Sequence, residues 1–388
     1  MGKKSYYDKY FNKRLKDFLL ICVTIGILDF ALAQFLNYVW APAGLRGEGV
    51  MVQTSSTIYH HDLLPMKESI AGWGPYRYPL ITNSLGFKDS STREIILDPD
   101  ESRILIIGDS FTEGVGVPFE QTFAGQIKDA FRPHGIDVLN AGVSSYSPTI
   151  YYRKIRYLLE DVGLKFDWLA VFIDISDIED EASIYTLDDN QNVVCKPQAT
   201  ETLNGRHFCE RPSRTVMWLK RKLRRHSIIV RFVYAIRDWL SPKDPIVSDP
   251  IERVTGKERI LWTVEPDLFE AYGRSGLKQA SEAMVRLNAL LIDLGINLII
   301  AVYPRTDQIM RRDLDSIQVR FFRDWAAEND AYFLNLFPWF INQQDPTSVV
   351  LKYHIPGDVH WNEAGHKLVA EVFLENAPIF LLRQDSTP

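Results

Sequence analysis

The stretch ILIIGDSFTEGVG, residues 104–116, decides the fold, because an apolar run ends in Gly-Asp-Ser and a helical pattern follows. A short run rich in Ile and Leu that stops at a glycine is typical of a strand buried on both faces of a parallel sheet. Residues 119–131 predict the helix that follows the turn. Ligands and catalytic groups gather at the carboxyl ends of strands in open α/β sheets, so Ser110 is a candidate nucleophile.

The segment GDVHWNEAGHKLVAEVF, residues 357–373, offers the two groups that a serine nucleophile needs. An imidazole takes the proton of the hydroxyl and later returns it to the leaving group, while a carboxylate fixes the imidazole tautomer. Asp358 and His360 are separated by one residue, and residues two apart in an extended chain project to the same face. We therefore predict a catalytic triad of Ser110, His360 and Asp358.

Four short blocks resemble the SGNH (GDSL) hydrolase superfamily: GDSFTEG from residue 108, NAGVSSYSP from 140, IDISD from 173 and DVH from 358. The resemblance covers roughly residues 80–380 and is poor after residue 180. The segment TNSLGFKD from residue 82 is similar to one that precedes the first block in membrane-anchored bacterial relatives. The resemblance implies a flavodoxin-like three-layer αβα sandwich, a Ser-His-Asp site and an oxyanion hole that serves acyl transfer.

Three positions depart from the pattern of this family. Its second block ends in a glycine whose amide joins the oxyanion hole, and Ser145 stands there, with Gly142 as a competing assignment. Its third block has an asparagine where this chain has Ser176, whose shorter side chain can donate one hydrogen bond. Loss of one such donor lowers the rate by about 100 to 1,000-fold. Its last block is usually Asp-x-x-His, whereas one residue separates Asp358 from His360 here. The form Asp358-x-His360-Trp also resembles SGNH-like O-acetyltransferases that modify exopolysaccharides.

The amino-terminal region predicts a membrane anchor. A basic tail over residues 1–17 precedes an apolar stretch over 18–40 that is long enough to cross a bilayer, and the basic flank favours a cytoplasmic amino end. Asp29 at mid-span is unfavourable in lipid unless it faces a partner, so an amphipathic or buried helix is the alternative. As a single-pass signal-anchor in a bacterial inner membrane, it would place the catalytic domain in the periplasm or outside the cell.

The three cysteines agree with an oxidising compartment. Cys22 lies in the predicted span, which leaves Cys195 and Cys209 as a pair around a short loop. In such a compartment we expect them to form a disulfide, with two independent thiols as the alternative.

The net charge, one basic segment and one acidic cluster indicate which partners and ligands to expect. The net charge of −6 gives no reason to expect nucleic acid as a partner. Residues 211–240 alternate basic and apolar side chains, which indicates either a helix face packed on the sheet or over the site, or an interfacial helix on anionic lipid or polysaccharide. Five acidic residues form a cluster: Asp174, Asp177, Glu179, Asp180 and Glu181. The cluster lacks the turn glycines of loops that bind hard cations, and we expect no metal or cofactor.

The coarse organisation is an anchor, a juxtamembrane segment over 41–100 and an α/β domain over 101–388. Alternating strands and helices predict right-handed crossovers and a mostly parallel five-stranded sheet. The expected strands are 103–107, 137–141, 168–174, 297–302 and 331–336, and the expected helices are 119–131, 149–162, 266–294, 314–328 and 362–382. The pattern breaks at about 181–262, which we interpret as an inserted cap or a small separate domain.

These patterns lead to a functional expectation and two alternatives. The expected protein is a serine-dependent acyl-ester hydrolase that removes acetyl or other acyl groups from a carbohydrate through an acyl-enzyme on Ser110. The oxyanion hole would use Ser145 and Ser176. The first alternative is an O-acyltransferase of cell-surface polysaccharide with the same triad, because both reactions share the acyl-enzyme. The second is a catalytically weak carbohydrate-binding or scaffold protein.

Overall fold

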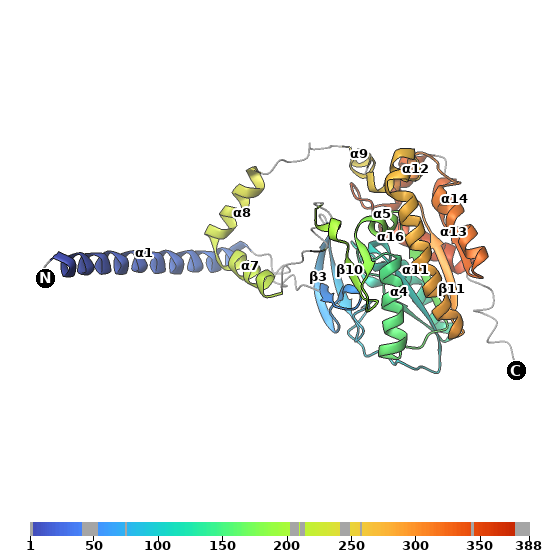
Figure 1. Ribbon diagram of the computed structural model, residues 1–388, viewed down its shortest axis with the longest axis horizontal. Coiled ribbons are helices and arrows are strands. Elements are labelled where there is room, and N and C mark those ends of the chain that lie inside the picture. Colours follow the sequence, from blue (N-terminus) through green and yellow to red (C-terminus); the bar gives the residue numbers. More distant parts are fainter. Residues whose placement is uncertain are drawn as a thin grey trace. The chain divides into compact units, whose positions relative to one another are not determined.

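The computed structural model describes residues 3–40, 53–73, 76–201, 209, 214–240, 249–256, 258–342 and 345–376. The chain divides into two compact units, residues 1–48 with 210–246, and residues 49–209 with 247–388 (Figure 1). We call them the anchor unit and the α/β unit and describe each by itself.

Five parallel strands form the centre of the α/β unit. Their order across the sheet is β7 (Ile136–Asn140), β6 (Ser102–Gly108), β8 (Trp168–Ile173), β11 (Asn297–Val302) and β12 (Tyr332–Asn335). In chain order this is 2-1-3-4-5, the flavodoxin-like arrangement. The side chains of β8 are all buried, as expected of a strand covered on both faces. The predicted parallel sheet is confirmed.

Three antiparallel strands extend the sheet beyond β7, so it has eight strands and not the predicted five. They are β5 (Lys88–Asp89), β4 (Tyr76–Thr82) and β3 (Lys67–Trp73). They lie in the stretch that the sequence assigned to a juxtamembrane segment over 41–100. Side chains of β3 alternate between exposed and half-buried, so this strand lacks the continuous apolar run that marked the central strands. A separate hairpin pairs β1 (Gln53–Ser56) with β2 (His60–Leu63).

Helices cover both faces of the sheet, which confirms the predicted three-layer sandwich (Figure 1). On one face α3 (Phe123–Phe131) packs against α16 (Glu363–Asn376). On the other, α4 (Pro148–Tyr157) packs against α11 (Arg274–Asp293), which also contacts α5 (Asp177–Ser183). Right-handed crossovers account for this division.

The predicted helices are present with shifted ends. Residues 119–131 contain a 3-10 turn, η1 (Phe119–Gln121), before α3, and the helix expected over 266–294 consists of α10 (Pro266–Leu268), a π turn and α11. The helix expected from 314 is α13 (Ile317–Glu328). Residues 377–382 of the last predicted helix lie outside the described residues. Other short elements include β9 (Tyr185–Leu187), β10 (Val193–Cys195), α9 (Pro250–Val254), α12 (Thr306–Met310), α14 (Phe337–Ile341) and α15 (Pro346–Tyr353).

The insertion expected over about 181–262 is divided between the two units. Its first part forms the β9–β10 hairpin, and the expected disulfide joins Cys195 to Cys209 with 6.0 Å between their Cα atoms. Its last part returns to the α/β unit, where the fully buried Trp262 donates its indole N–H to the Ile175 carbonyl at 2.9 Å. Only residues 210–246 group with the amino terminus. Hydrogen bonding and apolar burial therefore tie both ends of the segment to the α/β unit. The inserted cap and the small separate domain both stay predictions.

The anchor unit contains α1 (Lys3–Trp40), α7 (Arg214–His226) and α8 (Ile228–Leu240). Within α1 the 25 residues Arg14–Tyr38 are long and apolar enough to cross a membrane. Helices α7 and α8 form a hairpin that contacts α1.

Candidate active site

Ser110 lies at the turn between β6 and the short helix α2 (Ser110–Glu113). The Asp109 carboxylate caps this helix by accepting the Phe111 N–H at 2.9 Å. A Cβ on Gly108 would come within 2.1 Å of the Thr112 hydroxyl oxygen, so only glycine allows this close approach. The turn places Ser110 at the carboxyl end of β6, where the strand order reverses between β6 and β8.

The structure brings the three predicted triad residues together. His360 Nε2 lies 2.8 Å from Ser110 Oγ, and His360 Nδ1 lies 2.6 Å from Asp358 Oδ1. Ser110 and His360 are 250 positions apart in the chain, so the fold and not local sequence creates this contact. A hydroxyl within hydrogen-bond reach of an imidazole that is itself held by a carboxylate is the arrangement of an activated nucleophile.

Asp358 and His360 are paired by a turn and not by the extended chain that we expected. Residues 356–360 form a turn and a bend, which Gly357 enters with φ +72°. Asp358 Oδ1 accepts the backbone N–H of His360 at 3.0 Å as well as contacting its ring. The one-residue spacing therefore works because a single carboxylate oxygen holds both the backbone and the ring of His360.

The electrostatics keep Asp358 ionised. Its partial burial raises the pKa of the carboxyl, but hydrogen bonds from the ring and backbone of His360 and from Trp73 outweigh burial and lower it to about 2. Asp358 is thus negatively charged at neutral pH. A carboxylate in this position stabilises an imidazolium on His360.

Trp73 is a site residue that the sequence analysis missed. Its indole N–H donates to Asp358 Oδ2 at 3.0 Å, and its ring meets the His360 ring edge to face, with 4.8 Å between centroids. The Phe111 ring lies 4.7 Å from the same imidazole. Trp73 is 285 positions from Asp358 and belongs to β3, so no local motif signals its role.

The two other histidines near these motifs belong to the core. His354 and His366 are buried, and burial lowers the pKa of each to about 3. His366 Nδ1 accepts the Phe123 N–H at 3.3 Å. Neither takes the place of His360 beside Ser110.

Ser145 stands where the family that the sequence resembles has glycine, and its backbone has a conformation that favours glycine. Its φ of +67° lies in the left-handed region that favours glycine. No acceptor for the Ser145 N–H is found within the described part of the chain. The Gly142 N–H, in contrast, donates to Asn140 Oδ1 at 3.0 Å, and a Cβ on Gly142 would come within 2.6 Å of Thr112. Gly142 therefore serves close packing, which favours Ser145 of the two competing assignments.

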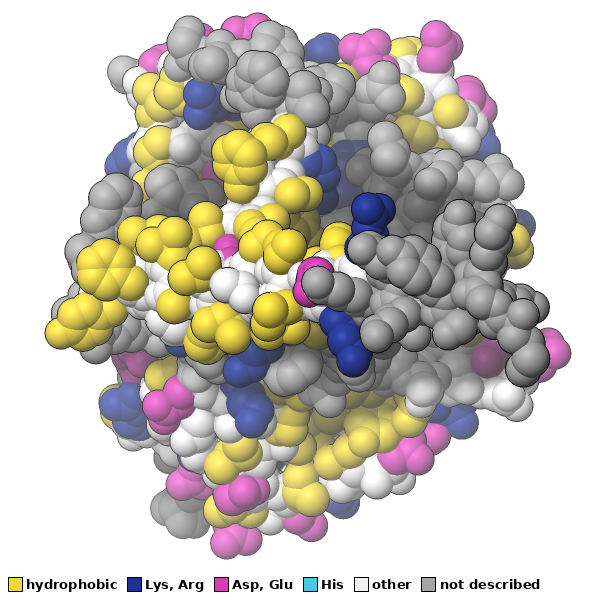
Figure 2. Space-filling view, turned by 90° about the vertical axis from the view of Figure 1, so that its left-hand side faces the viewer, with side chains coloured by type: hydrophobic (Ala, Val, Ile, Leu, Met, Phe, Trp, Pro, Cys, Tyr) yellow, Lys and Arg dark blue, Asp and Glu magenta, His cyan; other side chains and the backbone are white. Residues whose placement is uncertain are grey.

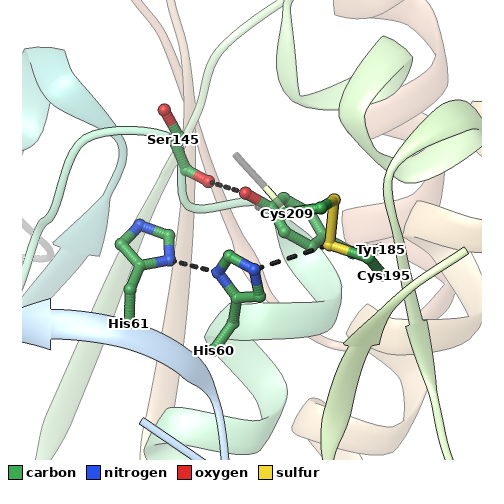
Figure 3. Close-up of a disulfide and its surroundings, with 6 residues drawn as sticks. All are labelled: His60, His61, Ser145, Tyr185, Cys195 and Cys209. Atoms are coloured by element: carbon green, nitrogen blue, oxygen red, sulfur yellow. Dashed lines mark hydrogen bonds between the residues drawn. A yellow bond between two sulfur atoms is a disulfide. The ribbon is translucent and has the colours of Figure 1, made fainter. Parts of the chain in front are cut away.

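The loop that carries Ser145 is held from three directions. Glu113 Oε2 accepts the Ser144 N–H at 2.7 Å and the Ser144 hydroxyl at 2.6 Å. The Ser144 carbonyl lies 2.8 Å from His61 Nε2, and the Tyr185 hydroxyl donates to the Ser145 carbonyl at 3.1 Å. Figure 3 shows the Tyr185 contact together with the neighbouring disulfide.

The same close-up shows that the disulfide lies beside this loop. His60 bridges the two, with its Nδ1 2.8 Å from His61 Nδ1 and its Nε2 3.5 Å from Cys195 Sγ (Figure 3). The β1–β2 and β9–β10 hairpins, which carry no recognisable motif, therefore support the loop of Ser145.

Ser176 differs from the expectation. Its backbone N–H donates to Asp174 Oδ1 at 2.7 Å. This amide would have to release Asp174 before it could donate to a substrate oxygen.

Three buried carboxylates lie beside the nucleophile. Oxygen atoms of Asp109, Asp174 and Asp177 lie within 4.8 Å of one another, a spacing that suits a metal ion. Burial and mutual repulsion raise the pKa of Asp109 and Asp177, whereas Arg305, 3.1 Å from Asp174, outweighs burial there and lowers its pKa. The Tyr303 hydroxyl donates to Asp109 at 3.2 Å. Because a guanidinium and a hydroxyl already serve these carboxylates, we assign no metal.

Comparisons with known proteins concern the fold. No family model matches the sequence, and no curated protein is similar to it. A catalytic mutant of Axe2, an acetylxylan esterase from Geobacillus stearothermophilus, is 16% identical with a TM-score of 0.38, over 72% of this chain and 95% of that one. LAE5, an α/β hydrolase enzyme from the metagenome of Lake Arreo, is 15% identical with a TM-score of 0.37, over 71% and 94%.

A third solved structure is a putative lipolytic protein of the G-D-S-L family from Desulfitobacterium hafniense. It is 14% identical with a TM-score of 0.36, over 70% of this chain and 97% of that one. The strand order 2-1-3-4-5, with Ser110 following its first strand, defines the class as an α/β protein with a flavodoxin-like three-layer fold. The fold implied by the sequence blocks is thus confirmed.

Proposed function

We propose that this protein is a membrane-anchored SGNH-type hydrolase that cleaves carboxylic esters through an acyl-enzyme on Ser110. One observation carries the proposal: the continuous hydrogen-bonded path from Ser110 Oγ through the His360 ring to Asp358. Trp73 supports it, because its indole N–H occupies the second oxygen of Asp358 and so fixes the orientation of the carboxylate.

The reaction has two halves. His360 Nε2 takes the Ser110 proton while Oγ attacks the ester carbonyl, and the same proton passes to the departing alcohol as the tetrahedral intermediate collapses. In the second half His360 takes a proton from water, the hydroxide attacks the acyl-enzyme, and the acid leaves as the proton returns to Ser110. The backbone N–H groups of Ser110 and Ser145 hold the oxyanion in both halves.

We propose an acetylated carbohydrate as the substrate. The Asp358-x-His360-Trp361 form, which is similar to that of carbohydrate O-acetyltransferases, supports this choice. Acyl transfer to a sugar hydroxyl is the second candidate, and the same form favours it. In that reaction the sugar hydroxyl replaces water in the second half.

For location, we propose that α1 anchors the protein in a bacterial cytoplasmic membrane with the α/β unit on the outer side. The apolar span Arg14–Tyr38 and the basic residues before it support this topology. The disulfide between Cys195 and Cys209 supports an oxidising compartment for the α/β unit.

Replacement of Ser110 tests the proposal. The variant Ser110→Ala is expected to lose turnover of a small acetyl ester by at least about 10⁴-fold and to lose labelling by a fluorophosphonate. Ser91→Ala, at an exposed serine, is the matched control and should keep both. Folded wild-type protein without labelling would overturn the esterase proposal and favour the carbohydrate-binding alternative.

An acceptor assay separates hydrolysis from transfer. The acetyl ester is offered with and without an oligosaccharide acceptor. Turnover that needs no acceptor supports hydrolysis, whereas product that forms only with the acceptor supports transfer.

A further inference from the structure

Three polar residues interrupt the distal half of the apolar span of α1, and each of them contacts the α7–α8 hairpin. Asp29 Oδ1 accepts the backbone N–H groups of Ile228 at 2.8 Å and of Ile229 at 3.0 Å. Asn37 Nδ2 donates to the Arg225 carbonyl at 3.1 Å, and Gln34 is hydrogen-bonded to His226. The polar residues that are unfavourable in lipid therefore have partners within the anchor unit.

Asp29 of α1 caps the amino end of a different helix, α8. The first N–H groups of a helix have no partner within it, and the positive end of the helix dipole favours a negative charge. Asp29 meets both needs at the amino end of α8. Ala33, one turn further along α1, has no exposed surface, whereas every residue from 14 to 28 is exposed. The hairpin thus packs only on the distal part of the span.

The depth of this contact places the hairpin turn within the membrane if α1 is an anchor. Asp29 lies nine residues before Tyr38, the end of the span, which corresponds to roughly 14 Å along a helix axis. The hydrocarbon layer is about 30 Å thick, so its midplane lies at a similar depth. A segment that touches Asp29 therefore lies below the membrane surface.

The hairpin presents an apolar face that the anchor unit leaves uncovered. In α8, Ile229, Phe232, Val233 and Ile236 recur at the spacing of one helix face, and each is at least 40% exposed. In α7, Leu219 and Leu223 are exposed one turn apart. Figure 2 shows a band of hydrophobic side chains with Lys and Arg side chains beside it.

The charge of the hairpin is opposite to that of the chain. Residues 214–240 hold eight Lys and Arg against one Asp, whereas the whole chain has a net charge of −6. Arg224 and Arg237 lie over the Tyr234 ring, at 5.2 Å and 5.0 Å from its centroid, and so bring two cations together. Long basic side chains on an apolar helix extend to the headgroups while their stems remain in the acyl region.

We propose that the α7–α8 hairpin is a second membrane-binding element, lying in the bilayer leaflet on the side of the α/β unit. Its apolar face binds the acyl chains, and its Lys and Arg side chains bind anionic phospholipid headgroups. The proposal rests on the membrane anchor proposed above. Lipid is the expected partner of this face, because the hairpin packs directly on the distal part of the predicted span and its uncovered face therefore adjoins the same bilayer.

Fluorophores at single cysteines test this placement. The full-length chain with Cys22→Ser carries an environment-sensitive nitrobenzoxadiazole label at Phe232→Cys on the hairpin, at Leu28→Cys on the anchor, or at Ile292→Cys on α11. All three positions are exposed. In vesicles of phosphatidylglycerol and phosphatidylcholine that contain nitroxide-labelled lipid, we expect at least a twofold loss of fluorescence at positions 28 and 232 and none at 292.

The outcomes separate the hairpin from the anchor. Quenching at 28 with none at 232 would overturn the hairpin proposal and leave the anchor intact. Absence of quenching at both positions would overturn the anchor and the hairpin with it. Ile236→Cys repeats the hairpin measurement on the same face, so a folding defect in one variant does not decide the result.

Vesicle composition tests the part played by charge. In vesicles of phosphatidylcholine alone, quenching at 232 is expected to fall at least twofold while quenching at 28 is unchanged. Equal quenching at position 232 in both kinds of vesicle would overturn the contact with anionic headgroups, and only the burial of the apolar face among acyl chains would stand.

Discussion

The two sides of the active site are constructed differently. On the proton-transfer side, Ser110, His360 and Asp358 contact one another directly at 2.8 Å and 2.6 Å. On the oxyanion side, Ser145 adopts left-handed backbone in a loop held by side chains from elsewhere in the fold. Among these, Glu113 binds the preceding residue, Ser144. The members of the proposed triad thus contact one another directly, whereas the proposed oxyanion donor depends on its neighbours.

The largest expected effect is on the proton-transfer side. Asp358→Asn keeps the shape of the side chain but removes the charge and favours the wrong imidazole tautomer, so kcat is expected to fall about 10⁴-fold. Asp129→Asn, an exposed carboxylate remote from the motifs, is the matched control for steady-state assays with an acetyl ester. A loss below tenfold at Asp358 would show that another group orients His360.

A smaller loss is expected on the oxyanion side. Glu113→Ala leaves the Ser144 N–H without its acceptor, so the loop shifts and the Ser145 amide no longer meets the oxyanion. We expect kcat to fall about 100-fold with little change in KM. Glu113→Gln is the matched variant, because its amide oxygen can still accept from Ser144, and it should recover most of the activity. Equal losses in both variants would assign the effect to the charge of Glu113 and not to the loop.

Trp73→Phe weakens the proton-transfer side without breaking it. Phenylalanine keeps the ring against His360 but loses the hydrogen bond to Asp358, and we expect kcat/KM to fall about tenfold. The lost bond also raises the pKa of Asp358 above its value of about 2.

The sign of the resulting pH dependence follows from this pKa. A carboxyl whose pKa is depressed by folding stabilises the protein above the pKa of the unfolded chain, about 3.9, and this contribution is lost as pH falls through about 2. Trp73→Phe should therefore reduce the free energy of unfolding at pH 7, and the difference from wild type should shrink as pH falls toward 2. Urea unfolding at several pH values measures this, and a difference that does not change with pH would contradict it.

The sequence predicted the parts of the site that lie in short blocks. The central strands are continuous apolar runs, and Ser110, Asp358 and His360 stand at their ends or in the last block, so their positions followed from local patterns. The pairing of Asp358 with His360 was predicted, but for the wrong backbone conformation. Trp73 was not predicted, because a half-exposed strand brings it to the site from a distant part of the chain.

In the anchor unit, too, contacts between distant segments were not predicted from the sequence. Asp29 was recognised as needing a partner, yet that partner is a helix end about 200 positions away. The sequence marked residues 211–240 as basic and apolar, but only the three-dimensional contacts join them to α1. Patterns in the sequence identify strands, helices and charged faces, whereas contacts between segments with no shared pattern depend on the whole fold.

The smallest expected effect tests the backbone of Ser145 itself. Ser145→Gly relieves a left-handed conformation that costs a non-glycine residue of order 1 kcal/mol, although the greater freedom of glycine in the unfolded chain offsets part of the gain. We expect the free energy of unfolding to rise by about 0.5 kcal/mol and kcat to change less than threefold, because the amide remains. Ser145→Ala removes the same hydroxyl but keeps the unfavourable backbone, so it should retain activity without the gain in stability. If both variants lose about 100-fold in kcat, the donor at this position is the hydroxyl, and the oxyanion side depends on the side chain of Ser145 and not on its backbone.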